Sequence, residues 1–137
     1  MMKKNSIKPT DIVLLLLALA SMAGMATVFH PCGPMEDGGW MRCHWAWIST
    51  LGAESVLLLL SVLRLFVRSS GIKAGMSIAC IPVALLAALT PGLLIPLCSM
   101  KDMRCHALTR PAAVVLSLLV VAAATADLFV QPKGKKA

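Results

Sequence analysis

The sequence predicts an all-α polytopic membrane protein, a bundle of four transmembrane helices made of two parallel two-helix repeats. Three observations predict this fold: the composition, four long apolar blocks, and a motif that occurs twice. Of the 137 residues, 58% are hydrophobic and only 14% are charged, whereas a soluble domain is about half apolar and about a quarter charged. This composition excludes an ordinary cytosolic enzyme, a disordered chain and a small secreted domain held by disulfides. We expect one transmembrane domain over residues 1–137.

The four apolar blocks are each roughly 18–22 residues long, enough for one helix to cross a hydrocarbon layer of about 30 Å. Backbone groups in lipid must be hydrogen-bonded within the protein, so each block should be a helix. The first block follows a basic start and also resembles a signal peptide, but the repeat described below requires it as a span. The blocks are residues 12–29, 46–67, 76–97 and 111–130. Three tryptophans at the outer edge of the second block fit an interfacial aromatic belt: Trp40, Trp45 and Trp47.

Lysine and arginine are distributed unequally between the two ends of the expected bundle. Cytoplasmic segments are enriched in both, so both termini should be cytoplasmic, with residues 30–47 and 98–110 extracytoplasmic, in the plasma membrane of a prokaryote. The net charge of +7 is then a topology signal, strengthened by anionic lipid, and not a sign of nucleic-acid binding. Nine basic residues lie on the inner side (Lys3, Lys4, Lys8, Arg64, Arg68, Lys73, Lys133, Lys135 and Lys136) and four on the outer side (Arg42, Lys101, Arg104 and Arg110).

The tetrapeptide Met-Arg-Cys-His occurs at residues 41–44 and again at 103–106. Each copy follows an earlier cysteine and precedes a span, and both halves of the chain end in Leu-Phe-Val. We therefore expect two halves, about 11–67 and 75–130, of the same topology, related by a pseudo-axis along the membrane normal. Such an axis brings the two outer loops together over the mouth of the bundle.

The expected outer segments hold all three histidines and four of the five cysteines. Thiolate, imidazole and thioether groups select zinc, copper or iron, so one interpretation is a soft-metal or haem site. A second is a disulfide within each loop, Cys32–Cys43 and Cys98–Cys105, which an oxidising compartment permits. No C-x-x-C spacing occurs, and adjacent residues such as Cys43 and His44 point about 100° apart on a helix. The metal candidates are Cys32, Met41, Cys43, His44, Cys98, Met103, Cys105 and His106, and the cofactor candidates are His30, His44, His106 and Glu54.

Cys43 and Cys105 are also candidates for thiol–disulfide chemistry. They are expected just before the amino ends of the second and fourth spans, where the helix dipole and a neighbouring arginine favour a thiolate. Four spans with two outer cysteine pairs resemble the quinone-linked disulfide-generating membrane oxidases. Those enzymes carry C-x-x-C in the first outer loop, whereas ten residues separate Cys32 from Cys43 here.

Charged residues also fall within the expected spans. Glu54 lies about two turns inside the second span, where a carboxylate costs several kcal/mol unless it is neutral, paired or hydrated. It is either a structural pair between helices or a functional group beneath the outer loops. Arg64 and Asp127 lie near the inner ends and are expected to snorkel towards water. The third block contains three prolines that are expected to kink it: Pro82, Pro91 and Pro96.

The twin motif in two-span halves resembles a family of small bacterial and archaeal membrane proteins, catalogued as domain of unknown function four-four-one-eight. The resemblance covers about residues 12–130. The family usually follows its histidine with an aromatic residue and threonine, and both copies here depart from that pattern, with Trp45-Ala46 in the first and Ala107-Leu108-Thr109 in the second. The resemblance implies a four-span membrane protein, often encoded beside exporter-type ABC transporters with large extracytoplasmic domains. It implies no established activity.

These observations predict a non-enzymatic membrane protein, an accessory subunit of an ABC exporter-type system, whose outer Cys, His and Met residues bind a partner, metal or cofactor. The sequence has no phosphate-cradling glycine loop, no H-E-x-x-H and no G-x-S-x-G. Two alternatives remain: a membrane thiol–disulfide oxidoreductase acting through Cys43 or Cys105, and a structural protein held by disulfides. The expected partners are the lipid bilayer and an ABC transporter permease.

Overall fold

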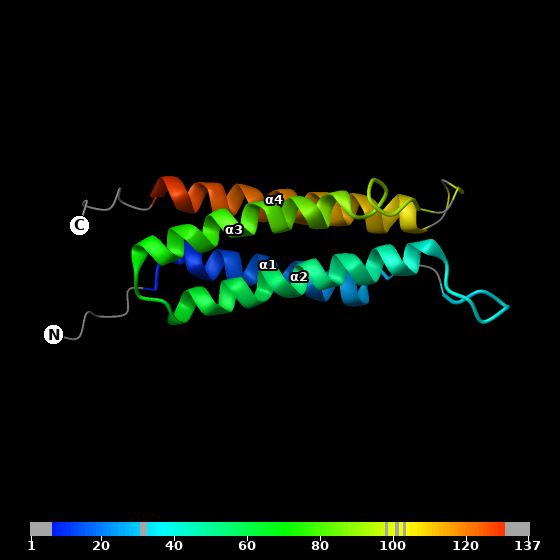
Figure 1. Cartoon of the computed structure of the whole chain (residues 1–137), viewed down its shortest axis with the longest axis horizontal. Coiled ribbons are helices and arrows are strands. Elements are labelled where there is room, and N and C mark those ends of the chain that lie inside the picture. The colour runs from blue at the N-terminus through cyan, green and yellow to red at the C-terminus, as the bar shows by residue number, and fades with distance from the viewer. Residues whose placement is uncertain (1–6, 31–32, 98, 101, 103, 131–137) are drawn as a thin grey trace.

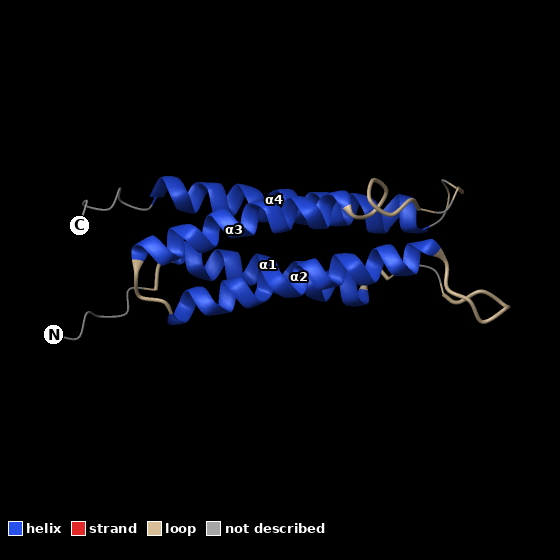
Figure 2. Ribbon diagram, viewed as in Figure 1, coloured by secondary structure: helices blue, strands red, loops and turns tan. Residues whose placement is uncertain are grey.

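Four long helices run side by side in a bundle (Figure 1). The computed structural model describes residues 7–30, 33–97, 99–100, 102 and 104–130. Within them the regular structure is helical (Figure 2), apart from one isolated bridge between Pro91 and Ile95. The predicted all-α four-helix bundle is confirmed. The elements are α1 (Pro9–Thr27), α2 (Arg42–Phe66), α3 (Ser70–Leu89), the π-helix η1 (Cys105–Thr109) and α4 (Arg110–Val130), which continues η1.

All four helices are long and apolar enough to cross a membrane. Even the shortest, α1 with 19 residues, extends about 28 Å at 1.5 Å per residue. Large apolar side chains face outward on every helix, among them Leu16, Leu59, Leu86 and Leu118. Such a surface is stable in hydrocarbon, so the chain is a multi-pass membrane protein in contact with the lipid bilayer.

The helices pack as a ring in chain order, with contacts between α1 and α2, α2 and α3, α3 and α4, and α4 and α1. Consequently α1 lies diagonally across from α3, and α2 across from α4. The start of α1 and the end of α4 share one end of the bundle (Figure 1). We call this the terminal end, and we call the opposite end, which carries residues 33–41 and 90–97, the loop end.

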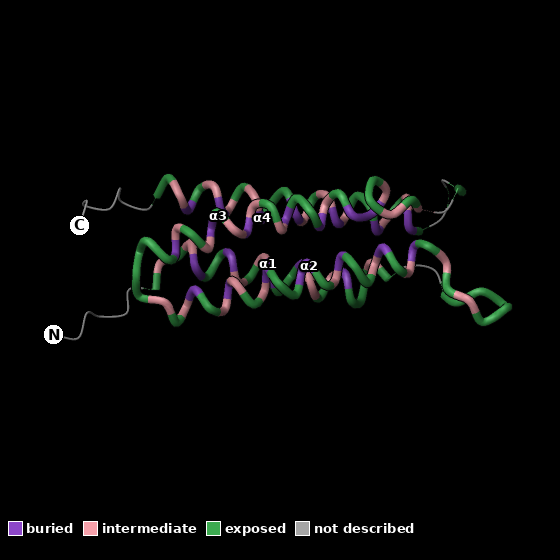
Figure 3. Tube along the Cα trace, in the orientation of Figure 1, coloured by how far each residue is buried: buried purple, intermediate pink, exposed green. Residues whose placement is uncertain are grey.

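A narrow buried stripe runs along each helix towards the bundle axis (Figure 3). Its central layer contains Leu14, Leu57 and Val120 together with the small residues Cys80, Ala84 and Ala124. In lipid, helices associate mainly by close packing, and small side chains allow their backbones to approach. The core is therefore thin, and polar residues occupy the stripe on both sides of this layer.

The third span lies closer to the amino terminus than residues 76–97, the predicted block. Helix α3 ends at Leu89, and only Pro82 lies inside it, so the expectation that Pro91 and Pro96 kink this helix is wrong. Proline has no N–H to donate, and its ring clashes with the carbonyl four residues earlier, which explains why the helix does not continue through Pro91. The chain then turns at Gly92, whose φ is +103° and whose N–H donates to the Ile95 carbonyl at 3.0 Å.

The second and fourth spans begin earlier than predicted. Met41 is the residue before the first turn of α2, and Cys105 begins η1. Residues 42–47 and 105–110, which were predicted to be loop, are therefore helical. A helix does not have to end where its apolar block ends, because polar residues can continue it into the headgroup region.

Replacing Gly92 with alanine is expected to lower the free energy of unfolding by about 1–3 kcal/mol, the typical strain of a non-glycine residue at such a backbone angle. A Cβ at Gly92 would also lie 3.0 Å from Arg110 Nε. Thermal unfolding of the purified protein in detergent measures the effect. The control is Gly52→Ala, because Gly52 is helical with open space around it and alanine favours helix. Equal unfolding midpoints for the two variants would contradict the expectation.

Candidate functional site

A cluster of ionised side chains joins all four helices at the terminal end, and we call it the charge cluster. Arg64 Nη2 lies 2.7 Å from Asp11 Oδ1 and 2.8 Å from Asp127 Oδ2. Lys73 Nζ lies 2.6 Å from Asp11 Oδ2. Ser77 Oγ donates to Asp127 Oδ2 at 2.6 Å and accepts a hydrogen bond from Arg64 Nη1. Each helix thus contributes at least one member.

The expectation that Arg64 and Asp127 snorkel to water is wrong, because both are fully buried. The two cations face two carboxylates, so the charge cluster is neutral as a unit, and Arg64 bonds both acids at once. A buried charge is tolerated when it is paired and hydrogen-bonded. The charged groups of the charge cluster pair with one another, an arrangement that holds the four helices together.

Asp11, Lys73 and Ser77 were not proposed as site residues from the sequence. A usable signal was present, because Asp11 and Lys73 are 62 residues apart, the same separation as the two Met-Arg-Cys-His copies. Arg64 and Asp127 are 63 residues apart, the separation of the two Leu-Phe-Val tripeptides. The residues at these two separations therefore carry opposite charges.

A second buried polar group lies nearer the middle of the bundle. Ser21 Oγ donates to Glu54 Oε2 at 2.6 Å, which joins α1 to α2, and both residues are 0% exposed. Glu54 Oε1 is buried without a hydrogen-bond partner among the described residues, and so is Ser117 Oγ on α4. Glu54 therefore pairs helices, as one of the two sequence interpretations stated, but only one of its oxygens is used for that.

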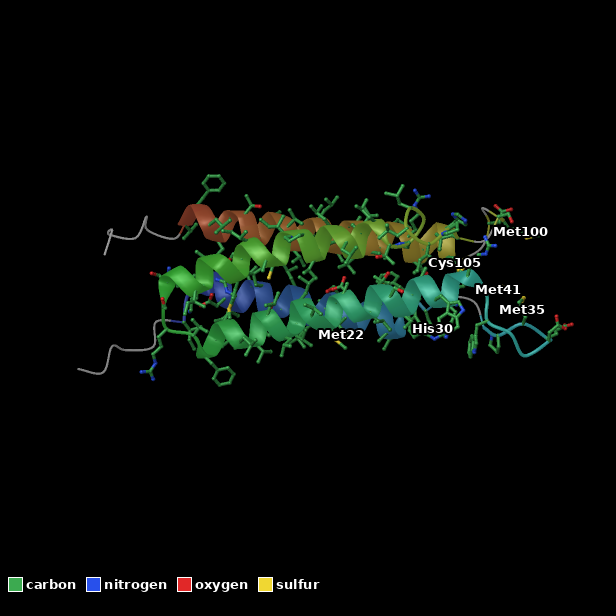
Figure 4. All side chains as sticks on the ribbon, in the orientation of Figure 1. Met22, His30, Met35, Met41, Met100 and Cys105 are labelled. Carbon is green, nitrogen blue, oxygen red and sulfur yellow. The ribbon has the colours of Figure 1, made fainter. Side chains whose placement is uncertain are left out.

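The candidate residues of the outer segments lie at the loop end. Met35, Met41, Met100 and Cys105 are found there, with His30 close by (Figure 4). Cys43 and Cys105 are buried, at 2% and 0% exposure. Cys43 is the second residue of α2 and Cys105 the first of η1. Both thiol groups therefore sit within the first turn of a long helix and are screened from solvent.

Two of the three histidines belong to an aromatic cluster at the start of α2. The ring of Trp40 stacks on that of His44, with centroids 3.9 Å apart, and Trp47 lies 4.6 Å from His30 and 5.7 Å from His44. Trp47 Nε1–H donates to the Met25 carbonyl at 2.7 Å, which fixes the start of α2 against the end of α1. Trp40 and Trp47 thus lie at an end of the bundle and also pack against these two histidines.

The third histidine, His106, is half-buried in η1 on the other hairpin. In the part of the chain that the structure describes, no three His, Cys, Asp or Glu side chains are grouped closely enough to hold a metal ion. Cys32, Cys98 and Met103 lie outside the described residues. The complete proposed metal set and the proposed disulfides Cys32–Cys43 and Cys98–Cys105 therefore remain predictions.

A family model described as Domain of unknown function (DUF4418) matches residues 12–130. Neither a curated protein nor a solved structure matches the chain. The matched residues include all four helices except the first turn of α1, together with the charge cluster, except Asp11, and both copies of the repeated tetrapeptide.

Proposed function

Because this chain belongs to the family Domain of unknown function (DUF4418), which brings no activity with it, we propose its role from the geometry. We propose a non-enzymatic membrane protein whose loop end binds a partner, a soft metal or a cofactor. The role suggested by the family resemblance is that of an accessory subunit of an ABC exporter-type transport system. A transporter permease would then be its protein partner.

The observation that carries this proposal is the unequal distribution of reactive groups. At the terminal end, the charged side chains of the charge cluster are paired with one another. At the loop end, buried Cys43 and Cys105 lie at helix starts, with His30, His44 and His106 on the same end of the bundle. Thiol, imidazole and thioether groups are ligands for soft metals and haem. This end therefore has chemistry that packing alone does not require.

We also propose that the chain consists of two homologous halves of parallel topology, about residues 11–67 and 75–130. The buried positions of α2 support this, because six of them are each followed 63 residues later by a buried position. Cys43 and Cys105 differ by 62 residues, and η1 supplies the extra residue, since a π-helical turn holds one residue more than an α-helical turn. The six pairs are Ala46 and Thr109, Thr50 and Ala113, Glu54 and Ser117, Leu57 and Val120, Ser61 and Ala124, and Arg64 and Asp127.

The proposed orientation places both termini in the cytoplasm and the loop end outside. Arg64 and Lys73, counted as cytoplasmic charges from the sequence, are buried in the charge cluster and no longer count as loop charges. Seven basic residues remain on that side against four on the other, so the bias still supports this orientation. Fusion of a reporter that is active only in the cytoplasm to either terminus tests it.

The loop-end site is tested by titrating the detergent-purified protein with zinc, copper(I) and haem. Metal content and the visible spectrum are measured after removal of unbound ligand. We expect stoichiometric uptake of one of these probes, at least tenfold weaker in Cys43→Ser/Cys105→Ser. The matched control is Cys80→Ser, because Cys80 is equally buried but lies in the central layer. No uptake by the unaltered protein would contradict the proposed metal and cofactor function.

The accessory role is tested by co-purification with a permease, and a stable lone monomer would contradict it.

Thiol–disulfide exchange is the second candidate function. Cys43 and Cys105 support it, because both lie in the first turns of their helices, a position in which reactive cysteines occur. Such an enzyme oxidises a dithiol of its substrate and passes two electrons to a quinone. Mass spectrometry after thiol alkylation, with and without prior reduction, would show whether the cysteines are bridged. Bridges that persist with glutathione and quinone would favour the disulfide-held structural protein instead.

A further inference from the structure

We propose that Glu54, together with Ser21 and Ser117, forms a proton-binding site in the middle of the bundle. This site is separate from the loop-end cysteines and histidines, and it does not depend on the function proposed for them. Three observations support the proposal: the common depth of the three residues, two buried oxygens without hydrogen-bond partners among the described residues, and the number of protons available to the observed hydrogen bonds.

The three residues lie at the same depth. Each is ten residues along its helix from a member of the charge cluster, a distance of about 15 Å. The charge cluster aligns α1, α2 and α4 at the terminal end. Positions ten residues away from it along these three helices therefore lie at the same depth in the bundle. The Ser21–Glu54 hydrogen bond of 2.6 Å shows this directly for two of them. Helix α4 lies across the bundle axis from α2, so Ser117 approaches from the side opposite Glu54. The pairs are Asp11 and Ser21, Arg64 and Glu54, and Asp127 and Ser117.

Two oxygen atoms at this level have unused hydrogen-bonding capacity. Glu54 Oε1 and Ser117 Oγ make no hydrogen bond within the described residues, and their residues are 0% and 1% exposed. The buried cations Arg64 and Lys73 are already bonded to two aspartates and lie about 15 Å away along the helices. A carboxylate surrounded by lipid and packed side chains is strongly disfavoured without a cation. Protonation removes this charge.

The two contacts of Ser21 Oγ are also better satisfied with an additional proton. Its Oγ lies 3.1 Å from the Ala18 carbonyl and 2.6 Å from Glu54 Oε2. A serine hydroxyl has one proton, and both of these oxygens are acceptors when Glu54 is ionised. If Glu54 is protonated at Oε2, it donates to Ser21 Oγ, and Ser21 donates to Ala18. One bound proton therefore satisfies both contacts.

The three side chains suit a proton better than a divalent metal ion. They offer four oxygen atoms in total, whereas Ca²⁺ takes six to eight oxygen ligands and Mg²⁺ takes six in an octahedron. On the side of the charge cluster, the next buried positions of α2 are Leu57 and Ser61, followed by Arg64. On the side of the loop end, the next buried positions are Ala53 and Thr50. The nearest buried polar side chain of α2 therefore lies on the side of the loop end.

A hydrophobic carbodiimide tests the proposal, because it modifies protonated carboxyl groups in apolar surroundings. The chain contains its own controls, since Asp11 and Asp127 are as buried as Glu54 but are paired with cations. After reaction of the full-length protein in liposomes, peptide mass spectrometry is expected to find the label on Glu54 at least tenfold above either aspartate. Above the midpoint, labelling should fall about tenfold per pH unit. Ser117→Ala should move this midpoint, and Ser55→Ala should not, because Ser55 is exposed on the same helix as Glu54.

Infrared difference spectroscopy between the unaltered protein and Glu54→Gln provides a measurement that needs no reagent to enter the bundle. We expect the carbonyl band of a protonated carboxylic acid, which shifts in heavy water and is absent from the variant. A carboxylate band at neutral pH would overturn the proposal. Labelling of Asp11 and Asp127 equal to that of Glu54 would overturn it too. Protection by Na⁺ that does not depend on pH would assign the site to a metal cation instead.

Discussion

Replacing Arg64 with methionine is expected to lower the free energy of unfolding by about 3–5 kcal/mol, the typical cost of removing one partner from a buried ion pair. Arg64 bonds Asp11 and Asp127 simultaneously, and Lys73 compensates only one of these carboxylates. The variant would leave a net negative charge within the bundle. A methionine fills a comparable volume, so the loss would come from charge and hydrogen bonding rather than from a cavity.

The matched control for this substitution is Arg68→Met, because Arg68 lies four residues further along the chain and is exposed. Circular dichroism during heating in detergent, together with size-exclusion profiles, measures both variants. We expect Arg64→Met to lose most of its folded fraction under conditions in which Arg68→Met is unchanged. Arg64→Lys should be intermediate, because lysine keeps the charge but lacks the planar fork that contacts two carboxylates. Similar stability of Arg64→Met and Arg68→Met would show that the charge cluster does not hold the bundle together.

Replacing Ala124 with leucine is the second substitution with a large expected effect, a loss of about 1–3 kcal/mol from overpacking. Ala124 is 0% exposed and packs in the central layer with Cys80 and Ala84. Small side chains there allow α3 and α4 to approach closely. Three additional carbon atoms would force the helices apart or push neighbouring side chains out of their preferred rotamers.

The same helix provides the control for this prediction. Ala122 is exposed, and Ala122→Leu adds the same atoms on a lipid-facing surface, where leucine is as apolar as its surroundings. The midpoints of thermal unfolding of both variants are compared in one detergent. A decrease confined to Ala124→Leu is expected. Equal decreases would mean that the added volume, and not its place in the central layer, causes the loss.

The sequence was sufficient to predict the four spans, because a helix in lipid needs only length and apolar composition. Their ends were harder to predict. The third span was placed six residues too late, since Met76 begins the uncharged block while the helix begins at Ser70. Lys73 interrupts the hydropathy but not the helix, because its charge is matched by Asp11 on a diagonal helix. A hydropathy value is assigned to each residue separately, so it does not include the effect of an oppositely charged residue on another helix.

The same reason explains what was missed at the sites. Glu54 was recognised from its position within a span, but its partner Ser21 belongs to another helix. The packing of His30 and His44 around Trp47 likewise depends on how α1 and α2 meet. The sequence predicted Cys43 and Cys105 just before the amino ends of their spans, and the structure has both within the first helical turns. Whether they bind a metal, a cofactor or their neighbouring cysteines stays a prediction.

The charge cluster has a consequence for how the chain assembles. The hairpin of α1 and α2 brings an acid and a base, Asp11 and Arg64, and the hairpin of α3 and α4 brings the complementary pair, Lys73 and Asp127. Each hairpin therefore carries one charge of each sign, and two of the three ion pairs join one hairpin to the other. These two ion pairs connect the hairpins across the bundle axis, so the charge cluster is complete only when both hairpins are in place.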